Sequence, residues 1–164
     1  MQGVIQQVSV SRGGVPKRAI EGAVLTRERV EGDDWAHPQY HGGPQQAVLL
    51  IAEEVLEDLK QQGYPVFNGA LGENLTTRGL NPHEWRKGQI FRVGAARIEL
   101  TKPRSPCSTI EVYGPTIRSA IYDAKVKAKD PSSPVWGYSG FYAAVITEGF
   151  VRAGDSIELE SQMV

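Results

Sequence analysis

The chain has 164 residues, 40% of them hydrophobic and 23% charged, a balance typical of a globular protein with a sizeable core. Its net charge of −1 gives no strong field for nucleic acid or a membrane surface, and no apolar run approaches the roughly 20 residues that span a bilayer. One cysteine cannot form an internal disulfide and the N-terminus lacks the features of a signal peptide, so we expect a single cytoplasmic domain over residues 1–164, without nucleic-acid or membrane partners.

The N-terminal half alternates between short apolar segments and turns. The 18 glycines and 10 prolines favour a β-rich fold over a helix bundle. Strands are predicted at 4–10, at 18–25 with a bulge at Gly22, and at 45–52. A helix is predicted over 52–62, with apolar residues on one face and a solvated acidic face opposite, and Gly63 is a natural C-cap.

The loop 37–44 carries two adjacent glycines before a proline, which regular structure cannot accommodate. A glycine backbone can approach a ligand closely, and the amides of Gly42 and Gly43 can form an anion-binding nest. His41 at the edge of this loop could donate to an anion or transfer a proton. The alternative is a plain tight turn with a surface histidine.

A second glycine-bearing loop, 68–75, contains two polar residues in a small and apolar stretch, Glu73 and Asn74. Because polar groups in such surroundings need hydrogen-bond partners, their side chains either bond to neighbouring loops or contact a ligand. The residue types alone leave both interpretations open.

The C-terminal half is predicted to contain most of the remaining strands. They are expected at 75–77, within 85–93 after a turn, and at 96–100, 140–147 and 156–160. A short helix is predicted over 108–113 and another after Pro115, and 151–155 is expected to be a turn. The basic run Lys125, Lys127 and Lys129 is interpreted as the solvated end of a helix.

The only cysteine, Cys107, lies between this predicted strand at 96–100 and the short helix. Pro103 and Pro106 stop regular structure and stiffen the loop that carries the thiol. Lys102 and Arg104 place positive charge nearby, which favours the thiolate, the reactive form of cysteine. The alternative is an inert thiol that packs as a small hydrophobic side chain.

Four separated motifs, read together, resemble the MOSC family, which is named for the C-terminal domain of molybdenum cofactor sulfurases. The resemblance covers nearly the whole chain, and the order and spacing of the motifs make it specific. The motifs are His41–Val48 (HGGPQQAV), Gly69–Leu75 (GALGENL), Pro103–Cys107 (PRSPC) and Arg152–Ile157 (RAGDSI).

This resemblance implies a mainly β fold with a few helices, built around a closed or nearly closed barrel. It implies that Cys107 carries sulfur as a persulfide or ligates molybdenum, with Arg104 and His41 acting beside it. The residues expected to bind the molybdenum cofactor are Gly42, Gly43, Glu73, Asn74 and Arg104. The implied partners are this cofactor, a molybdoenzyme or a sulfur donor.

Two departures from the family pattern bear on the cofactor. Ala144 stands where relatives often carry an arginine, so one cation for an anionic ligand is missing. The chain also ends soon after the predicted core, so contacts supplied by the C-terminal extension of some bacterial relatives are expected to be absent.

Three functions follow from these observations. In the first, Cys107 accepts a sulfane sulfur and delivers it to a metal–sulfur cofactor. In the second, Cys107 ligates molybdenum in a component that reduces N-hydroxylated substrates. In the third, the protein is a non-catalytic carrier or binding module for the cofactor.

Overall fold

The computed structural model describes residues 1–34 and 42–162, which form ten strands, three α-helices and two 3₁₀ helices. The strands are β1 (Gln2–Val10), β2 (Arg18–Ile20), β3 (Gly22–Leu25), β4 (Val48–Ala52), β5 (Leu75–Arg78), β6 (Gln89–Val93), β7 (Ala96–Pro103), β8 (Phe141–Thr147), β9 (Gly149–Arg152) and β10 (Ser156–Gln162). The helices are α1 (Glu53–Gln61), η1 (Pro82–Glu84), η2 (Ser108–Tyr113), α2 (Ile117–Ile121) and α3 (Ala124–Lys127).

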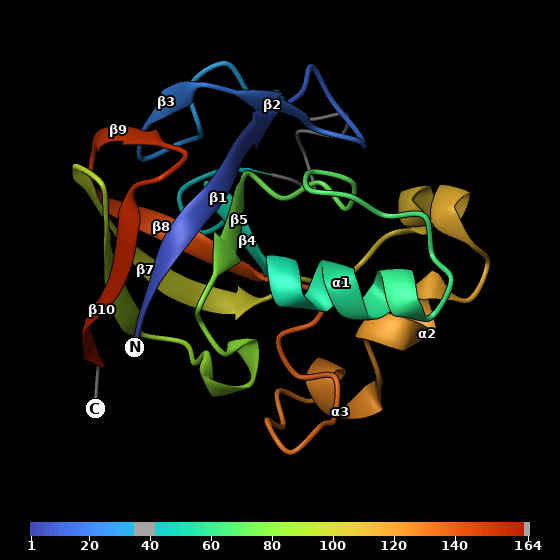
Figure 1. Ribbon diagram of the computed structural model, residues 1–164. Helices are drawn as coiled ribbons and strands as arrows, with labels where there is room; N and C mark the ends of the chain where they lie inside the picture. The colour runs from blue at the N-terminus through green and yellow to red at the C-terminus, as the bar shows by residue number, and fades with distance from the viewer. Residues whose placement is uncertain (35–41, 163–164) are drawn as a thin grey trace.

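A closed β-barrel forms the centre of the molecule (Figure 1). Seven strands pair in the order β10-β6-β7-β8-β4-β5-β1, and a pairing between β1 and β10 closes the ring. Closure leaves these strands without a free edge along the ring, which removes a template for aggregation. The predicted mainly β fold with a closed barrel is therefore confirmed.

The barrel core follows the two-residue period of its strands. On β8, Phe141, Ala143 and Val145 are buried, whereas the residues between them are only half-buried. Both Trp85 and Trp136 pack edge-on against Phe141, with ring centroids 6.1 and 5.7 Å apart. These contacts anchor the loops that enclose one end of the barrel.

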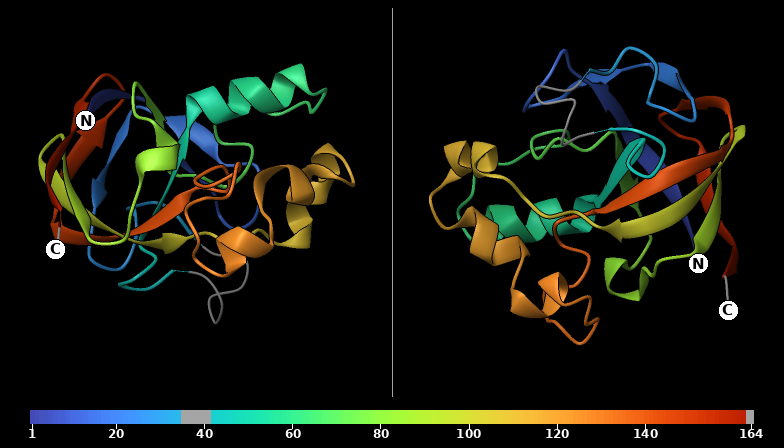
Figure 2. Two further views of the ribbon diagram at one scale, coloured as in Figure 1. Left: turned by 90° about the horizontal axis from the view of Figure 1, so that it is seen from below. Right: turned by 180° about the vertical axis from the view of Figure 1, so that it is seen from behind.

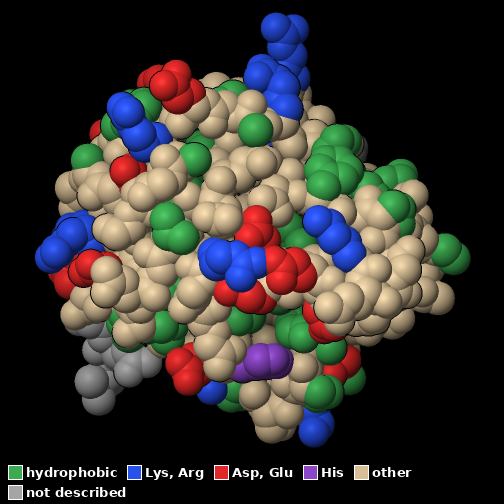
Figure 3. Space-filling model, viewed as in Figure 1, with side chains coloured by type: hydrophobic (Ala, Val, Ile, Leu, Met, Phe, Trp, Pro, Cys, Tyr) green, Lys and Arg blue, Asp and Glu red, His purple; other side chains and the backbone are tan. Residues whose placement is uncertain are grey.

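The three α-helices lie together on one side of the barrel (Figure 2). The acidic residues of α1 form a solvated face, as predicted, where red and blue side chains are interspersed (Figure 3). Arg78 of β5 makes ion pairs with Glu53 and Glu57 on this face. One cation of a neighbouring strand thereby offsets part of the negative charge of the acidic run. No helix in the described part of the chain is long and apolar enough to cross a membrane.

Two predicted elements differ because their partners are distant in sequence. The predicted single strand 18–25 is two strands: β2 pairs with β1, whereas β3 leaves the barrel and pairs with β9. The turn predicted at 151–155 is also wrong in its first two residues, because Val151 and Arg152 belong to β9 and pair with β3. Neither change could be found from local alternation of apolar residues.

Two further boundaries differ, one because of pairing with β8 and the other because of a local side-chain cap. The predicted strand 96–100 continues to Pro103, where Lys102 and Pro103 still oppose residues of β8. The helix predicted after Pro115 is split into α2 and α3. Asp123 interrupts it, because its side chain accepts a hydrogen bond from the Val126 amide and so begins a new helix.

Candidate functional site

A cavity of about 100 Å³, hereafter the thiol cavity, contains the only cysteine in its wall. Loops from distant parts of the chain line it: 14–17, 33–34, 42–49, 72–74 and 104–109, together with Tyr142 of β8. Its wall combines one thiol with charged, amide and hydroxyl groups. That combination is expected of a binding site rather than of an empty apolar core.

Cys107 lies four residues after the end of β7, on the proline-bearing loop, and its side chain is half-buried. Its Sγ is 2.7 Å from Oγ1 of Thr109 at the start of η2, a hydrogen bond in which the hydroxyl can donate to a thiolate. Burial raises the pKa of the Cys107 thiol, but hydrogen bonds from Thr109 and the positive charge of Arg104 outweigh burial. The net result is a pKa below the usual value, which favours the reactive form.

Arg104 supplies the nearby positive charge but does not point freely into the cavity. It is 5% exposed, and its Nη2 donates to the carbonyl of Leu71 at 2.6 Å. Nη1 donates to the carbonyl of Ser139 at 3.3 Å, and the Ser139 hydroxyl donates back to the Arg104 carbonyl at 2.6 Å. These bonds hold the guanidinium at a set position beside the thiol, so its charge acts on Cys107 from a rigid place.

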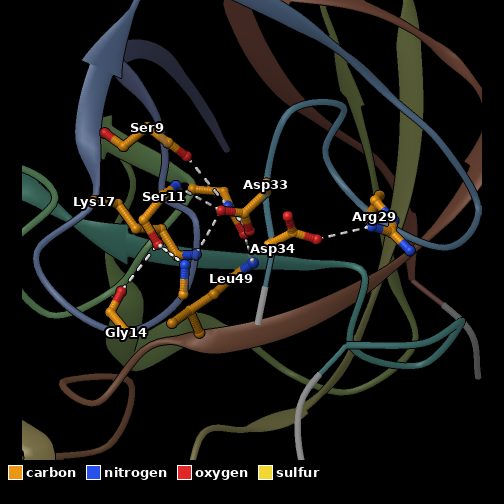
Figure 4. Close-up of polar contacts among 10 residues, drawn as sticks. Ser9, Ser11, Gly14, Lys17, Arg29, Asp33, Asp34 and Leu49 are labelled. Atoms are coloured by element: carbon orange, nitrogen blue, oxygen red, sulfur yellow. Dashed lines mark hydrogen bonds and ion pairs between the residues drawn. The ribbon is translucent and has the colours of Figure 1, made fainter. Parts of the chain in front are cut away.

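A buried polar network forms another wall of the cavity (Figure 4). Nζ of Lys17 lies 2.7 Å from Oδ1 of Asp33, and the two side chains are only 10% and 3% exposed. Oδ1 of Asp33 also accepts from the Ser11 amide, and Oδ2 accepts from Nδ2 of Asn74 at 2.9 Å. Oδ1 of Asn74 accepts from the Leu49 amide at 3.0 Å, which ties this network to β4. The charge of Lys17 is therefore compensated and fixed in place.

The glycine-bearing loop 69–74 explains how these walls meet. Gly69 has a positive φ of 94°, and a Cβ on it would lie 2.3 Å from the carbonyl of Lys17. The loop can approach Lys17 this closely only because glycine has no side chain. The Lys17 amide donates to the Gly69 carbonyl at 2.9 Å, and Leu71 two residues later accepts from Arg104. One loop thus positions a cation on each side of the cavity.

The structure brings only some of the predicted site residues together at the thiol cavity. Gly42, Asn74, Arg104 and Cys107 line the thiol cavity together. His41 lies outside the described residues. Gly43 follows Gly42 with a φ of 90°, and the space where its Cβ would be is open.

Glu73 and Ala144 do not line the cavity. Glu73 is fully buried, and its Oε2 accepts from the Gly69 amide at 3.0 Å and from the Thr76 hydroxyl at 3.1 Å. Burial raises the pKa of this carboxyl, and Oε1 has no hydrogen-bond partner within residues 1–34 and 42–162. The hydrogen bonds of Glu73 therefore join its loop to the start of β5. Ala144 opposes Glu99 in the barrel, on the same face of β8 as Tyr142.

Lys17, Asp33 and Tyr142 are cavity residues that sequence reasoning did not single out. A compositional signal existed for Lys17, since it follows Gly13-Gly14-Val15-Pro16, a stretch that matches the glycine–proline character of 42–44. Asp33 carried no such signal, because its segment is uniformly charged. Its role depends on contacts 16 and 41 residues away in sequence.

Comparison with known proteins gives consistent matches. Residues 37–158 match the family model of the MOSC domain. The chain is 34% identical over 151 residues to the uncharacterized protein YflK of Bacillus subtilis, and 32% identical over 154 residues to the protein YiiM of Escherichia coli. Both alignments cover 91% of this chain and 64% of the relative, so the chain spans less than two thirds of their length.

Similarity to solved structures supports the same fold. The crystal structure of YiiM from Geobacillus stearothermophilus superposes with a TM-score of 0.73 at 23% sequence identity. The superposition covers 97% of this chain and 75% of that structure.

Proposed function

This chain belongs to the MOSC domain family, which is associated with the molybdenum cofactor, and we propose that it is a sulfur carrier in which Cys107 holds sulfane sulfur as a persulfide. The observation that carries this proposal is the half-buried thiol, with a lowered pKa, in the wall of a cavity that also presents charged and polar side chains. A thiolate is the nucleophile that sulfur transfer needs, and a half-buried position lets a donor reach it.

Loading of Cys107 is a thiol exchange. The Cys107 thiolate attacks the outer sulfur of a donor persulfide, a sulfur–sulfur bond forms on Cys107, and the bond within the donor breaks. The donor leaves as its thiolate, so no external oxidant or reductant is required. The bound sulfur is then available to an acceptor such as a metal–sulfur cofactor.

The chain's own residues support that step in distinct ways. The Thr109 hydroxyl, 2.7 Å from Sγ, stabilises negative charge on sulfur before attack and on the persulfide afterwards. Arg104 contributes a fixed positive charge to the same end of the cavity. Lys17, paired with Asp33, adds no net positive charge but fixes the position of another wall of the cavity.

Intact-protein mass measures the loading directly. After incubation with glutathione persulfide and desalting, we expect wild type to gain about 32 Da, one sulfur atom, and to lose it on treatment with a reducing agent. Cys107→Ser removes the only thiol with little change in volume, so it should gain nothing while its circular dichroism and melting temperature match wild type. Equal mass gain in the variant, or none in wild type, would disprove the carrier role.

A second candidate function is favoured by the donor set of the same cavity. The soft thiolate of Cys107 suits a molybdenum ion, and the Gly42 amide suits an anionic or polar group of a pterin cofactor. These residues therefore fit the molybdenum cofactor, which when bound supplies redox chemistry. In this case Cys107 is a metal ligand instead of a sulfur carrier.

Metal content distinguishes the two functions. Protein purified from a host that makes the cofactor should contain molybdenum in near-stoichiometric amount if the second function holds, and Cys107→Ser should lose most of it. Wild type that gains sulfur but carries no molybdenum would support the carrier. Molybdenum retained in full by Cys107→Ser would rule out ligation by this thiol.

A further inference from the structure

A second cavity, of about 450 Å³, lies against the thiol cavity. Gln46, Ser105 and Tyr142 line both cavities, so the two spaces share a wall. We call the second one the lysine cavity, because Lys102, Lys127 and Lys129 line it together with Pro103, Tyr122 and Val126. Its volume is within the range of small-molecule binding sites.

The three lysines come from two separate parts of the fold. Lys102 lies on β7, five residues before Cys107, whereas Lys127 ends α3 and Lys129 follows it. The interpretation of 125–129 as a simple solvated helix end therefore omits a feature that only the fold creates. Lys129 holds a φ of 60°, which is uncommon for a residue other than glycine and directs the backbone after α3.

The positive charge of this cavity is uncompensated. Within residues 1–34 and 42–162, none of its three lysines forms an ion pair with a carboxylate. Like charges that face one space repel each other, and a bound polyanion relieves that repulsion. The Nζ of Lys102 lies 5.9 Å from the ring centroid of Tyr142, a residue that lines both cavities.

We propose that the lysine cavity binds the phosphate group of a small-molecule ligand whose other end reaches Cys107. Lysine ammonium groups bind phosphate as point charges, and the Ser105 hydroxyl and Gln46 amide can donate further hydrogen bonds. Tyr122 and Tyr142 supply aromatic surface for the part of the ligand between its two ends. This assignment concerns which compounds reach the thiol, and it does not depend on whether Cys107 carries sulfur.

Lys125 is a matched control on the same helix. It does not line the lysine cavity. The pKa of Asp123 is lowered first by the Val126 amide and the Ser133 hydroxyl, and that of Asp130 first by the amide and hydroxyl of Ser132; the charge of Lys125 adds a smaller lowering to both. Lys125 thus has the same charge as Lys127 and lies on the same helix, but its charge acts on two carboxylates, Asp123 and Asp130.

Calorimetric titration with inorganic pyrophosphate at low salt tests the binding. We expect Lys102→Ala and Lys127→Ala each to weaken binding about 3- to 10-fold, and Lys125→Ala less than about 2-fold. Cys107→Ser should bind as wild type does. The absence of binding to wild type, or equal weakening by Lys125→Ala, would overturn the proposal.

Thiol labelling tests the connection to Cys107. An iodoacetamide that carries a phosphate group should alkylate wild type faster than an uncharged iodoacetamide of equal length, and the advantage should disappear in the Lys102→Ala/Lys127→Ala double variant. Lys125→Ala should keep it. Equal rates for both reagents in wild type would refute the link between the two cavities, whatever the result of the persulfide assay.

Discussion

The thiol cavity and the lysine cavity share a wall but hold positive charge in different ways. In the thiol cavity, Lys17 is paired with Asp33, and Arg104 donates to two backbone carbonyls. In the lysine cavity, three ammonium groups are exposed and have no carboxylate partner among the described residues. The difference follows from burial, since a buried cation needs a partner whereas an exposed one is stabilised by water.

This difference predicts separate roles for the two sets of cations. The paired, buried cations form part of the folded framework and define where Cys107 and its surroundings lie. The unpaired, exposed lysines cost little folding free energy, and their positive charge is available to a ligand. Substitutions in the first cavity should therefore change stability and thiol chemistry, whereas those in the second should change ligand affinity.

The largest effect is expected from Asp33→Ala. This change leaves the Lys17 ammonium buried without its carboxylate and also removes acceptors for Ser11 and Asn74. The free energy of unfolding should fall by about 3–5 kcal/mol, measured by urea denaturation. Asp34→Ala is the control, because its pair with Arg29 is exposed and should contribute less than about 1 kcal/mol. Equal losses in the two variants would show that the Lys17 pair is not a framework contact.

Glu73→Gln should change how stability depends on pH. Burial raises the pKa of Glu73 in the folded state, so its stabilising contribution is complete below the unfolded pKa and is lost as pH rises through the folded pKa. The glutamine variant lacks this titration. Relative to wild type, it should gain about 1–2 kcal/mol in unfolding free energy between pH 4 and pH 8. Urea denaturation at both pH values checks this, and a pH-independent difference would contradict it.

Thr109→Val should slow the reaction of Cys107 with uncharged iodoacetamide at pH 7 by about 3- to 10-fold, because the thiolate loses a charge-assisted hydrogen bond. The pH profile of alkylation should move to higher pH. Ser108→Ala, one residue closer to the thiol in sequence but without a hydrogen bond to it, is the control. An unchanged profile in Thr109→Val would mean that the backbone amides of Thr109 and Cys107 and the charge of Arg104 lower the pKa of Cys107 without the Thr109 hydroxyl.

The smallest effect on stability is expected in the lysine cavity. Lys127→Ala removes an exposed side chain without an ion partner in the described chain, so the melting temperature should stay within about 2 °C of wild type. The same variant is expected to bind pyrophosphate more weakly. A large stability loss in Lys127→Ala would remove the contrast between the two cavities.

Local pattern was sufficient for much of the fold. The apolar face of α1, the hairpin of β6 and β7, and the proline loop before Cys107 all follow from contacts within a few residues of each other. Prediction failed where the partner was distant, as for β3 and β9, whose pairing joins residues 22–25 to 149–152. It also failed at Asp123, where a side-chain cap competed with the continuation of a helix.

The sequence by itself determined a β-rich chain, the motifs of its family, and a lone thiol on a stiff loop with Arg104 beside it, because composition and neighbouring residues control these properties. Only the tertiary structure decided that Lys17 pairs with Asp33 at the thiol cavity, and that Lys102 and Lys127 line the same neighbouring cavity. Barrel closure brings these loops together, and burial then determines which of their charges are paired.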